Sequence, residues 1–145
     1  MKKLYYSCEE FKSDCKKLAD EVRSHNPEVI VAIARGGLSL AHYLSELLNI
    51  REVISINSIG YDGEKKLDTI KVYNTPLIEQ GKRVLVVDDI ADSGETLKEV
   101  VKKLKEKNPS CEFKTATIFY KKSSIYQPDF KVREAKEWVE FFWSG

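Results

Sequence analysis

The sequence predicts an α/β fold in which a mainly parallel central sheet is flanked by helices. Short apolar runs rich in β-branched residues, such as Val29 to Ile33 and Val84 to Val87, are typical of strands buried on both faces. Segments with apolar residues at positions i, i+3, i+4 and i+7 alternate with these runs and predict helices with one buried face. Strands that alternate with helices in this way favour a parallel sheet.

Composition narrows the class of protein. The chain has 145 residues and a formal net charge of +1, so we expect a single domain over residues 1–145 with no nucleic-acid partner. Its three cysteines (Cys8, Cys15 and Cys111) are widely spaced, which argues against a disulfide framework and a zinc site. No apolar run approaches the roughly eighteen residues of a membrane helix. These features favour a cytoplasmic protein with a small-molecule partner and no membrane partner.

The first helix is predicted by its N-terminal cap. Ser7 followed by Glu10 is the pattern of a capping box, and an apolar face continues from there to Asn26-Pro27. The strand Val29 to Ile33 comes next. The glycine pair Gly36-Gly37 then predicts a turn into a second helix. The buried side of this helix is expected to carry Leu40, Tyr43, Leu44 and Leu47.

The remaining elements continue the alternation. A strand begins at Val53 to Ile56, and the polar stretch from Ser58 to Thr69 has no apolar period, so it is a candidate mobile loop. The strand Val84 to Val87 leads into a helix that extends to about Lys107. A last strand is predicted from Phe113 to Tyr120.

The segment from Val84 to Thr96, V-L-V-V-D-D-I-A-D-S-G-E-T, predicts a ligand site. Asp88 and Asp89 are expected at the carboxyl end of a central strand, where open α/β sheets bind ligands. The residues from Asp92 to Thr96 are expected at a helix N-terminus, where free N–H groups and the helix dipole favour an anion such as phosphate.

The same residues also have a purely structural interpretation. Asp92 and Glu95 could form a capping box, which would stabilise the helix by about 1 kcal/mol. Paired aspartates could likewise form a turn. However, two adjacent carboxylates disfavour each other, and a metal ion or a polyhydroxylated ligand would remove that conflict. The functional interpretation is therefore favoured.

A second phosphate loop is predicted at Arg35-Gly36-Gly37. Two glycines allow the backbone to approach a ligand closely, and the arginine fork suits phosphate oxygens. This turn also joins a strand end to a helix start, so it opens onto the same sheet edge. Together the two loops indicate a ligand with phosphate groups at two ends. Asp88 and Asp89 would lie between them and hold ribose hydroxyls, directly or through Mg²⁺.

At this point the sequence resembles a known family. Val84 to Thr96 is similar to the phosphoribosyl-pyrophosphate (PRPP) signature of the type I phosphoribosyltransferases, and Ala34 to Gly37 is similar to their pyrophosphate loop. The 6-oxopurine branch, which contains the hypoxanthine-guanine and xanthine-guanine enzymes, is favoured by Phe119-Tyr120-Lys121, Tyr126 to Phe130 and Trp138-Val139. The resemblance implies the type I phosphoribosyltransferase fold with a small C-terminal hood segment.

The resemblance also implies roles for individual residues. Asp92 is implied to be catalytic, as the general base that faces N7 of the purine. Asp88 and Asp89 are implied to bind Mg²⁺, directly or through water. The residues implied to bind PRPP and its phosphates are Arg35, Gly36, Gly37, Asp88, Asp89, Ser93, Gly94, Glu95 and Thr96. Base binding is implied for Lys121, Trp138 and Val139, and Tyr61 is implied to belong to a lid.

The implied reaction is transfer of the 5-phosphoribosyl group from PRPP to guanine, hypoxanthine or xanthine in purine salvage. Its products are the nucleoside 5′-monophosphate and pyrophosphate, and Mg²⁺ is the implied cofactor. Lys121 can donate a hydrogen bond but cannot accept one, which favours a 6-oxopurine over adenine. The family is usually dimeric or tetrameric, so a homo-oligomer is expected. Phe141, Phe142 and Trp143 are expected in the core or at a subunit contact.

Three alternatives remain at this stage. The chain could be a phosphoribosyltransferase for another base, or a regulator that binds PRPP or a nucleotide without catalysis, since one fold hosts both functions. It could also be a phospho-receiver domain with an acidic pocket. That alternative needs a further aspartate at another strand end, and Asp129, which follows Pro128 in loop-like sequence, fits it poorly.

Overall fold

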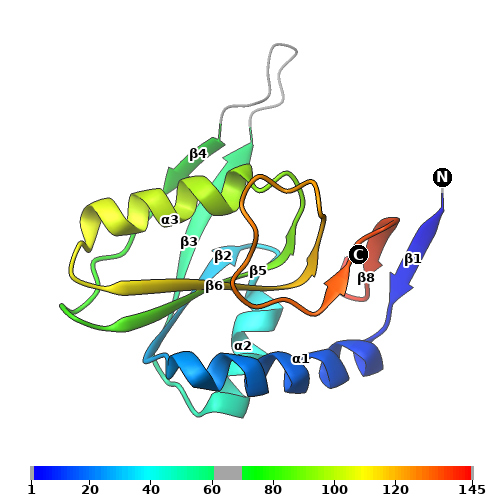
Figure 1. Ribbon diagram of the computed structural model, residues 1–145, viewed down its shortest axis with the longest axis horizontal. Helices are drawn as coiled ribbons and strands as arrows, with labels where there is room; N and C mark the ends of the chain where they lie inside the picture. The colour runs from blue at the N-terminus through cyan, green and yellow to red at the C-terminus, as the bar shows by residue number, and fades with distance from the viewer. Residues whose placement is uncertain (1, 61–69, 145) are drawn as a thin grey trace.

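The main sheet of the computed structural model has six strands in the order β4-β3-β2-β5-β6-β7 (Figure 1). The structure describes residues 2–60 and 70–144. All neighbouring strands are parallel except β3 and β4, which are antiparallel, so the predicted mainly parallel sheet is confirmed. The strands are β2 (Val29–Ala34), β3 (Val53–Gly60), β4 (Ile70–Tyr73), β5 (Arg83–Ala91), β6 (Glu112–Tyr120) and β7 (Arg133–Glu134).

Helices cover both faces of this sheet. The helices α1 (Cys8–Val22) and α2 (Leu38–Leu48) lie on one face, and α3 (Glu95–Lys107) lies on the other (Figure 1). A short 3₁₀ helix, η1 (Arg23–His25), follows α1. In the part of the chain that the structure describes, no helix combines the length and apolarity that crossing a membrane requires.

The central strands are apolar on both faces because helices cover both. In β5, Val84 and Val86 pack into the cluster that includes α3, whereas Leu85 and Val87 pack into the cluster that includes α1 and α2. All four side chains are fully buried. The unbroken apolar run in the sequence therefore reflects two cores, one on each side of the same strand.

The predicted capping box of α1 is confirmed. The Glu10 backbone N–H donates to Ser7 Oγ, and the Ser7 backbone N–H donates to Glu10 Oε1, both at 3.1 Å. The helix α2 ends at its C-cap residue Asn49, which has a φ of 56° and so lies in the left-handed region that asparagine tolerates. Local sequence therefore determines where α1 begins and where α2 ends.

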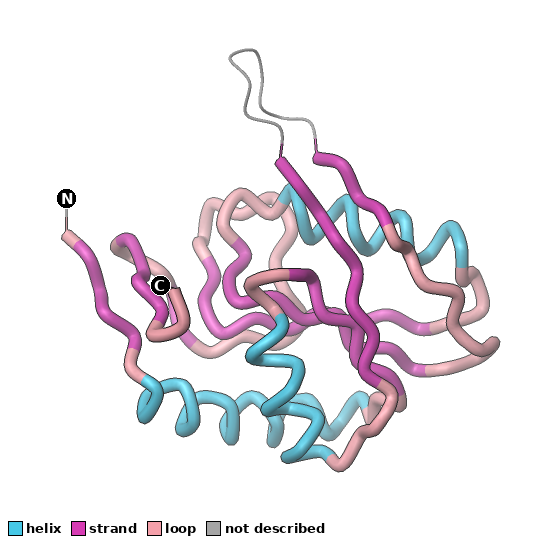
Figure 2. The backbone as a smooth tube through the Cα atoms, turned by 180° about the vertical axis from the view of Figure 1, so that it is seen from behind, coloured by secondary structure: helices cyan, strands magenta, loops and turns pink. Residues whose placement is uncertain are grey.

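A second sheet lies beside the main one and forms the hood. It consists of β1 (Lys3–Tyr6) and β8 (Trp138–Phe141), which run parallel and side by side (Figures 1 and 2). The predicted hood was only C-terminal, and this was incomplete, because the N-terminal strand forms half of it. Exposure alternates along β1, as expected of a strand with one buried face.

Two strands are longer than predicted. The strand β5 continues beyond Val87 to Ala91 because β6 still pairs with it there. The strand β3 continues to Gly60, so Ser58, Ile59 and Gly60 belong to a strand and not to the predicted loop. The rest of the predicted lid, including Tyr61, lies outside the described residues.

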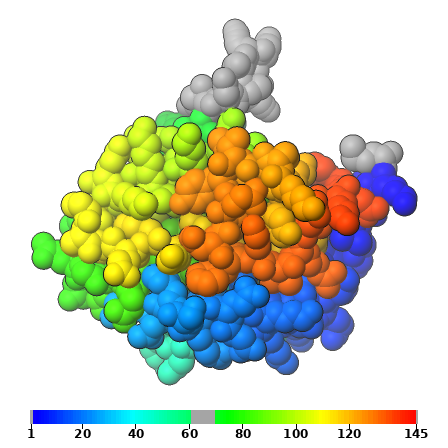
Figure 3. Space-filling model, in the orientation of Figure 1, coloured from blue at the N-terminus to red at the C-terminus, as the bar shows by residue number. Residues whose placement is uncertain are grey.

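The segment after β6, residues 121–132, lies on the surface between α3 and α1. Figure 3 shows this orange segment covering the space between α3 and α1. The aromatic residues near the C-terminus pack on α1, with the Trp143 and Phe11 ring centroids 5.2 Å apart and the Phe142 and Phe11 centroids 5.6 Å apart. Phe141 is buried. The expected core role is confirmed for Phe141, whereas Phe142 is 36% exposed.

A buried polar network ties the hood to the main sheet. The Asp14 carboxylate on α1 accepts a hydrogen bond of 2.5 Å from the Tyr6 hydroxyl on β1 and one of 2.7 Å from Arg133 Nε on β7. Asp14 is only 1% exposed. Burial and the neighbouring Asp14 carboxylate raise the pKa of the Tyr6 hydroxyl. One carboxylate therefore links three elements that are far apart in sequence.

We expect Arg133→Met to destabilise the fold by about 3 kcal/mol, because the buried Asp14 charge loses its compensating cation. Urea unfolding followed by circular dichroism measures this loss. Lys105→Met, at an exposed position of α3, is the control with the same charge change. Equal unfolding free energies for the two variants would contradict a stabilising role of the network.

Candidate active site

The candidate site begins where β2 and β5 separate. The strand β5 pairs with β2 only as far as Val87, which lies opposite Ala32, but it pairs with β6 as far as Ala91. Asp88 and Asp89 follow directly after the last pair with β2. The acid pair thus lies within β5 and not after it, at the point where the sheet opens on one side.

The Arg35-Gly36-Gly37 turn lies against this acid pair. A Cβ atom on Gly36 would be 2.5 Å from Asp89 Oδ2, and a Cβ atom on Gly37 would be 2.5 Å from the carbonyl oxygen of Val87. A side chain at Gly37 would therefore collide with strand backbone, and one at Gly36 would force the Asp89 carboxylate to move. Arg35 is exposed. The sequence-based expectation that the turn opens onto the same sheet edge is confirmed.

A cavity of about 200 Å³ lies between the acid pair and the start of α3. It is lined by Asp88, Asp89, Ile90, Ala91, Asp92, Ser93, Gly94, Thr96 and Leu97. The first N–H groups of a helix lack intrahelical partners, so this cavity suits an anion. Glu95, Arg35, Gly36 and Gly37 do not line it, although they were predicted to bind the same ligand.

The purely structural interpretation of Asp92 is wrong. Gly94, with a φ of 90°, is the N-cap residue of α3, and the Glu95 N–H donates to Ser93 Oγ at 3.2 Å. Asp92 instead has its Oδ1 atom 2.8 Å from Nζ of Lys121. The carboxylate therefore pairs with the first residue after β6 and does not cap the helix.

Backbone contacts hold the loops after β5 and β6 together. The Lys121 N–H donates to the Ala91 carbonyl at 3.0 Å, and the Ile125 N–H donates to the Ser93 carbonyl at 2.8 Å. A Cβ atom on Gly94 would be 2.6 Å from the Tyr126 backbone nitrogen. This close packing fixes the positions from which Asp92 and Lys121 extend.

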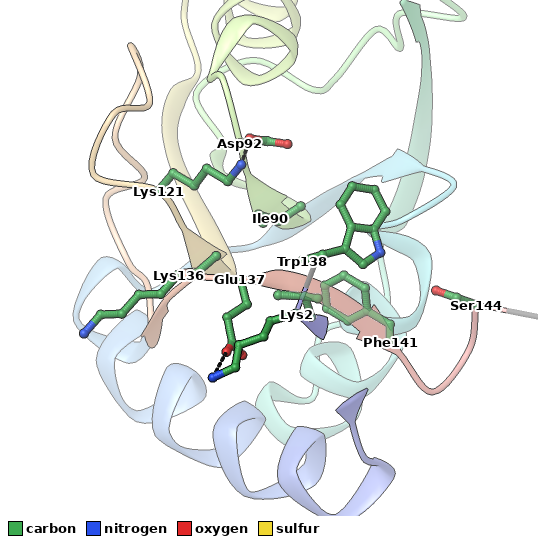
Figure 4. A pocket seen from close by; sticks show the side chains of 11 residues that line it. Lys2, Ile90, Asp92, Lys121, Lys136, Glu137, Trp138, Phe141 and Ser144 are labelled. Atoms are coloured by element: carbon green, nitrogen blue, oxygen red, sulfur yellow. Dashed lines mark ion pairs between the residues drawn. The ribbon is translucent and has the colours of Figure 1, made fainter. Parts of the chain in front are cut away.

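A larger pocket of about 690 Å³ adjoins this ion pair (Figure 4). Its lining includes Asp92, Lys121, Trp138 and Val139, so the structure brings the predicted catalytic and base-binding residues together. Trp138 is 60% exposed, as its position at an open pocket requires. Sequence reasoning missed the other lining residues, which are Lys2, Ile90, Ala135, Lys136, Glu137, Phe141 and Ser144.

Comparison with known proteins decides the family. The profile of the family described as "Phosphoribosyl transferase domain" matches residues 3–144. The chain belongs to the phosphoribosyltransferase family. Two curated relatives are xanthine-guanine phosphoribosyltransferases: that of Idiomarina loihiensis is 31% identical over 146 residues, and that of Cereibacter sphaeroides is 32% identical over 151 residues. Each alignment covers 98% of this chain and 87% of the relative.

Solved structures agree with this family assignment. A xanthine-guanine-hypoxanthine phosphoribosyltransferase of Helicobacter pylori has a TM-score of 0.91 and 39% identity, over 98% of this chain and 94% of the other. A purine phosphoribosyltransferase of Pyrococcus horikoshii has a TM-score of 0.88 and 30% identity, over 100% and 96% of the two chains. The predicted type I phosphoribosyltransferase fold is therefore confirmed.

One alternative from the sequence can now be dismissed. A phospho-receiver domain would need Asp129 in the acidic pocket, but its Oδ2 atom accepts a hydrogen bond of 2.8 Å from the Thr115 N–H. This contact keeps Asp129 beside the middle of β6. Both the family assignment and the geometry exclude the receiver interpretation.

In this phosphoribosyltransferase the adjacent carboxylates of Asp88 and Asp89 repel each other when both are charged. Asp88 Oδ1 accepts a 2.8 Å hydrogen bond from the Asp89 backbone N–H. Burial, and next the charge of Asp89, raise the pKa of the Asp88 carboxyl well above its ordinary value. Burial also raises the pKa of Asp89. A cation near these oxygens would offset this repulsion, so the pair suits a divalent ion.

The described residues contain no group of three or more acidic, histidine or cysteine side chains that could enclose a metal ion. Two carboxylates and an open side match the habit of Mg²⁺, which keeps several water ligands and shares substrate oxygens. The donor set therefore fits Mg²⁺ bound together with a phosphorylated ligand.

We expect Asp88→Asn to raise the stability of the ligand-free protein at pH 7. Because the folded-state pKa of Asp88 is raised, the folded protein binds this proton more tightly than the unfolded chain does. Stability is therefore lost as pH rises above the ordinary aspartate pKa of 3.8, and asparagine avoids that loss. Thermal unfolding at pH 7 and pH 4 measures the gain, which should shrink at the lower pH.

The exposed Asp20 on α1 provides the matched control, since Asp20→Asn should change the midpoint little at either pH. A lower midpoint for Asp88→Asn at pH 7 would show that the carboxylate stabilises the free protein, contrary to this expectation.

Proposed function

We propose that this phosphoribosyltransferase transfers the 5-phosphoribosyl group of PRPP to a 6-oxopurine base, namely guanine, hypoxanthine or xanthine. The observation that carries the proposal is the Asp92–Lys121 pair. Its oxygen and nitrogen atoms are 2.8 Å apart and lie in a mostly apolar pocket. This pocket lies beside the 200 Å³ cavity at the start of α3, here called the α3 cavity. A base and a phosphorylated sugar therefore have adjoining places.

The pair is complementary to one edge of a 6-oxopurine. The Asp92 carboxylate accepts a hydrogen bond from the purine N7–H, and the neighbouring Lys121 ammonium donates to O6. Adenine carries an amino group at C6, so it would place a donor against the Lys121 donor. A buried mismatch of this kind can discriminate by about 10⁴-fold, although the exposure of this pair reduces the factor here.

Apolar side chains bind the faces of the base. Trp138 stacks on the purine ring, and Ile90 lies beside it in the same pocket (Figure 4). The Val139 backbone, next along β8, contacts the other edge of the base. This arrangement leaves N9 directed toward the acid pair and hence toward the C1′ atom of the ribose.

The phosphate groups of PRPP occupy the two loops. The 5′-phosphate lies in the α3 cavity, where the backbone N–H groups of Ser93, Gly94 and Thr96 and the hydroxyls of Ser93 and Thr96 donate to it. The pyrophosphate lies at the Arg35-Gly36-Gly37 turn. Asp88 and Asp89 bind the ribose hydroxyls between these groups.

Asp88 and Asp89 would hold Mg²⁺, directly or through water, together with PRPP oxygens. When bound, Mg²⁺ neutralises charge on the departing pyrophosphate. Arg35 adds a fixed positive charge at the same leaving group, and the turn N–H groups add donors. The acid pair also favours the positive charge that develops on the ribose.

The proton on N7 has a defined destination. The lone pair on N9 forms the new bond to C1′ while the bond from C1′ to the pyrophosphate oxygen breaks. The purine gains positive charge in this step, so its N7 proton becomes acidic. Asp92 accepts that proton, and Lys121 holds Asp92 and the base in position.

We expect the purified protein to form nucleoside 5′-monophosphate from PRPP, Mg²⁺ and at least one of guanine, hypoxanthine and xanthine, with much lower activity toward adenine. Chromatographic detection of the nucleotide products measures this. Binding of PRPP without turnover of any base would instead favour a non-catalytic regulator, and turnover of adenine alone would favour a different base class.

Asp92→Asn should lower kcat by about 100-fold, because the amide keeps a hydrogen-bond acceptor but cannot take the proton. The Kd for PRPP should change little, since Asp92 contacts the base and not the sugar. Steady-state kinetics and calorimetry measure the two quantities, with Asp20→Asn as the surface control. An equal loss in kcat and in PRPP affinity would contradict the role of general base.

A further inference from the structure

A second ion pair lines the candidate base pocket. Nζ of Lys2 lies 4.0 Å from Oε2 of Glu137, and both residues belong to the lining of the 690 Å³ pocket. The pairing of β1 with β8 explains this contact. Lys3 lies opposite Trp138 in the parallel register, so the residues that precede them, Lys2 and Glu137, are also brought side by side.

The two ion pairs lie at different ends of the pocket. Figure 4 shows Asp92 and Lys121 at one end and Lys2 and Glu137 at the other, with Ile90 between them. The polar groups are thus separated by an apolar middle section. A flat ligand that spans this section must have polar atoms at both ends to satisfy both pairs.

A purine base meets this requirement. When N7 and O6 contact Asp92 and Lys121, the C2 substituent lies on the far side of the ring system. We propose that the Lys2–Glu137 pair determines preference at C2, the position at which guanine, hypoxanthine and xanthine differ. This inference rests on the proposed function and adds the residues that rank its three substrates.

The two side chains act in opposite directions because the three bases differ in hydrogen bonding. Guanine presents an amino donor at C2, which the Glu137 carboxylate accepts. Xanthine presents an oxo acceptor, which the Lys2 ammonium binds and the Glu137 carboxylate repels. Hypoxanthine has only hydrogen at C2. It is therefore an internal reference within the same pocket.

The pair is placed to adapt to either base. The Lys2 side chain is 86% exposed and that of Glu137 is 33% exposed, so neither is fixed by packing. Solvent screens their charges, which limits the size of the effect. The preference should therefore be moderate, and each single substitution should shift it without abolishing activity.

The test is the kcat/KM of guanine and of xanthine, each divided by that of hypoxanthine. Lys2→Met leaves the Glu137 charge uncompensated and should raise the guanine-to-xanthine ratio about fivefold. Glu137→Gln, whose amide can both donate and accept, should lower that ratio by a similar factor. The change should appear in KM, because C2 does not take part in bond making or breaking.

Matched controls come from neighbouring positions outside the pocket lining. Lys3→Met removes the same charge one residue later on β1, and Glu140→Gln removes the same charge on β8. Both should leave the ratio unchanged. Calorimetric Kd values for the three nucleoside 5′-monophosphates provide a second measurement that does not need turnover.

Opposite shifts for Lys2→Met and Glu137→Gln would support the inference. Unchanged ratios in both variants would overturn it, and so would an equal loss for all three bases, which would indicate a structural role alone. Failure of the proposed function is distinguishable, because the unaltered protein would then turn over none of the three bases.

Discussion

The limited pairing between β2 and β5 is the constraint on which the site depends. Both strands are buried and parallel as far as Val87, and beyond that residue only β6 remains beside β5. The unpaired side of β5 provides the space in which the acid pair and the glycine turn meet. Were β2 to continue beside Asp88, strand backbone would fill this space.

The same separation explains why the turn after β2 contains two glycines. Gly36 lies against the Asp89 carboxylate, and Gly37 lies against the backbone of Val87. The chain has to turn away from β5 while it is still in contact with β5, and a side chain would prevent this. The separation of β2 from β5 thus brings a tight turn, two carboxylates and a helix N-terminus together.

The central strand β5, the start of α1 and the residues of the phosphate loop were predicted well because their sequence signals are local. The apolar run of β5, the cap of α1 and the residues from Asp88 to Thr96 are contiguous, so period and chemistry could be interpreted together. The end of β5 was placed too early, because its extension depends on pairing with β6, which lies more than twenty residues away. Cross-strand register cannot be derived from one strand alone.

The hood was only partly predictable for the same reason. Trp138 and Val139 were recognised by resemblance, but Lys2 and Glu137 meet only because the two ends of the chain pair. For Asp92, local sequence left a helix cap open beside the favoured functional role, and the contact with the distant Lys121 decides against the cap. Residues whose partners are distant in sequence account for most of the differences.

Pairing of the first and last strands also has a practical consequence for handling the protein. Lys2, the residue before β1, lines the candidate base pocket. A purification tag fused directly before Lys2 would begin next to this pocket, where its side chains could compete with ligands. Removing such a tag completely therefore matters more here than in proteins whose first residues lie far from a binding site.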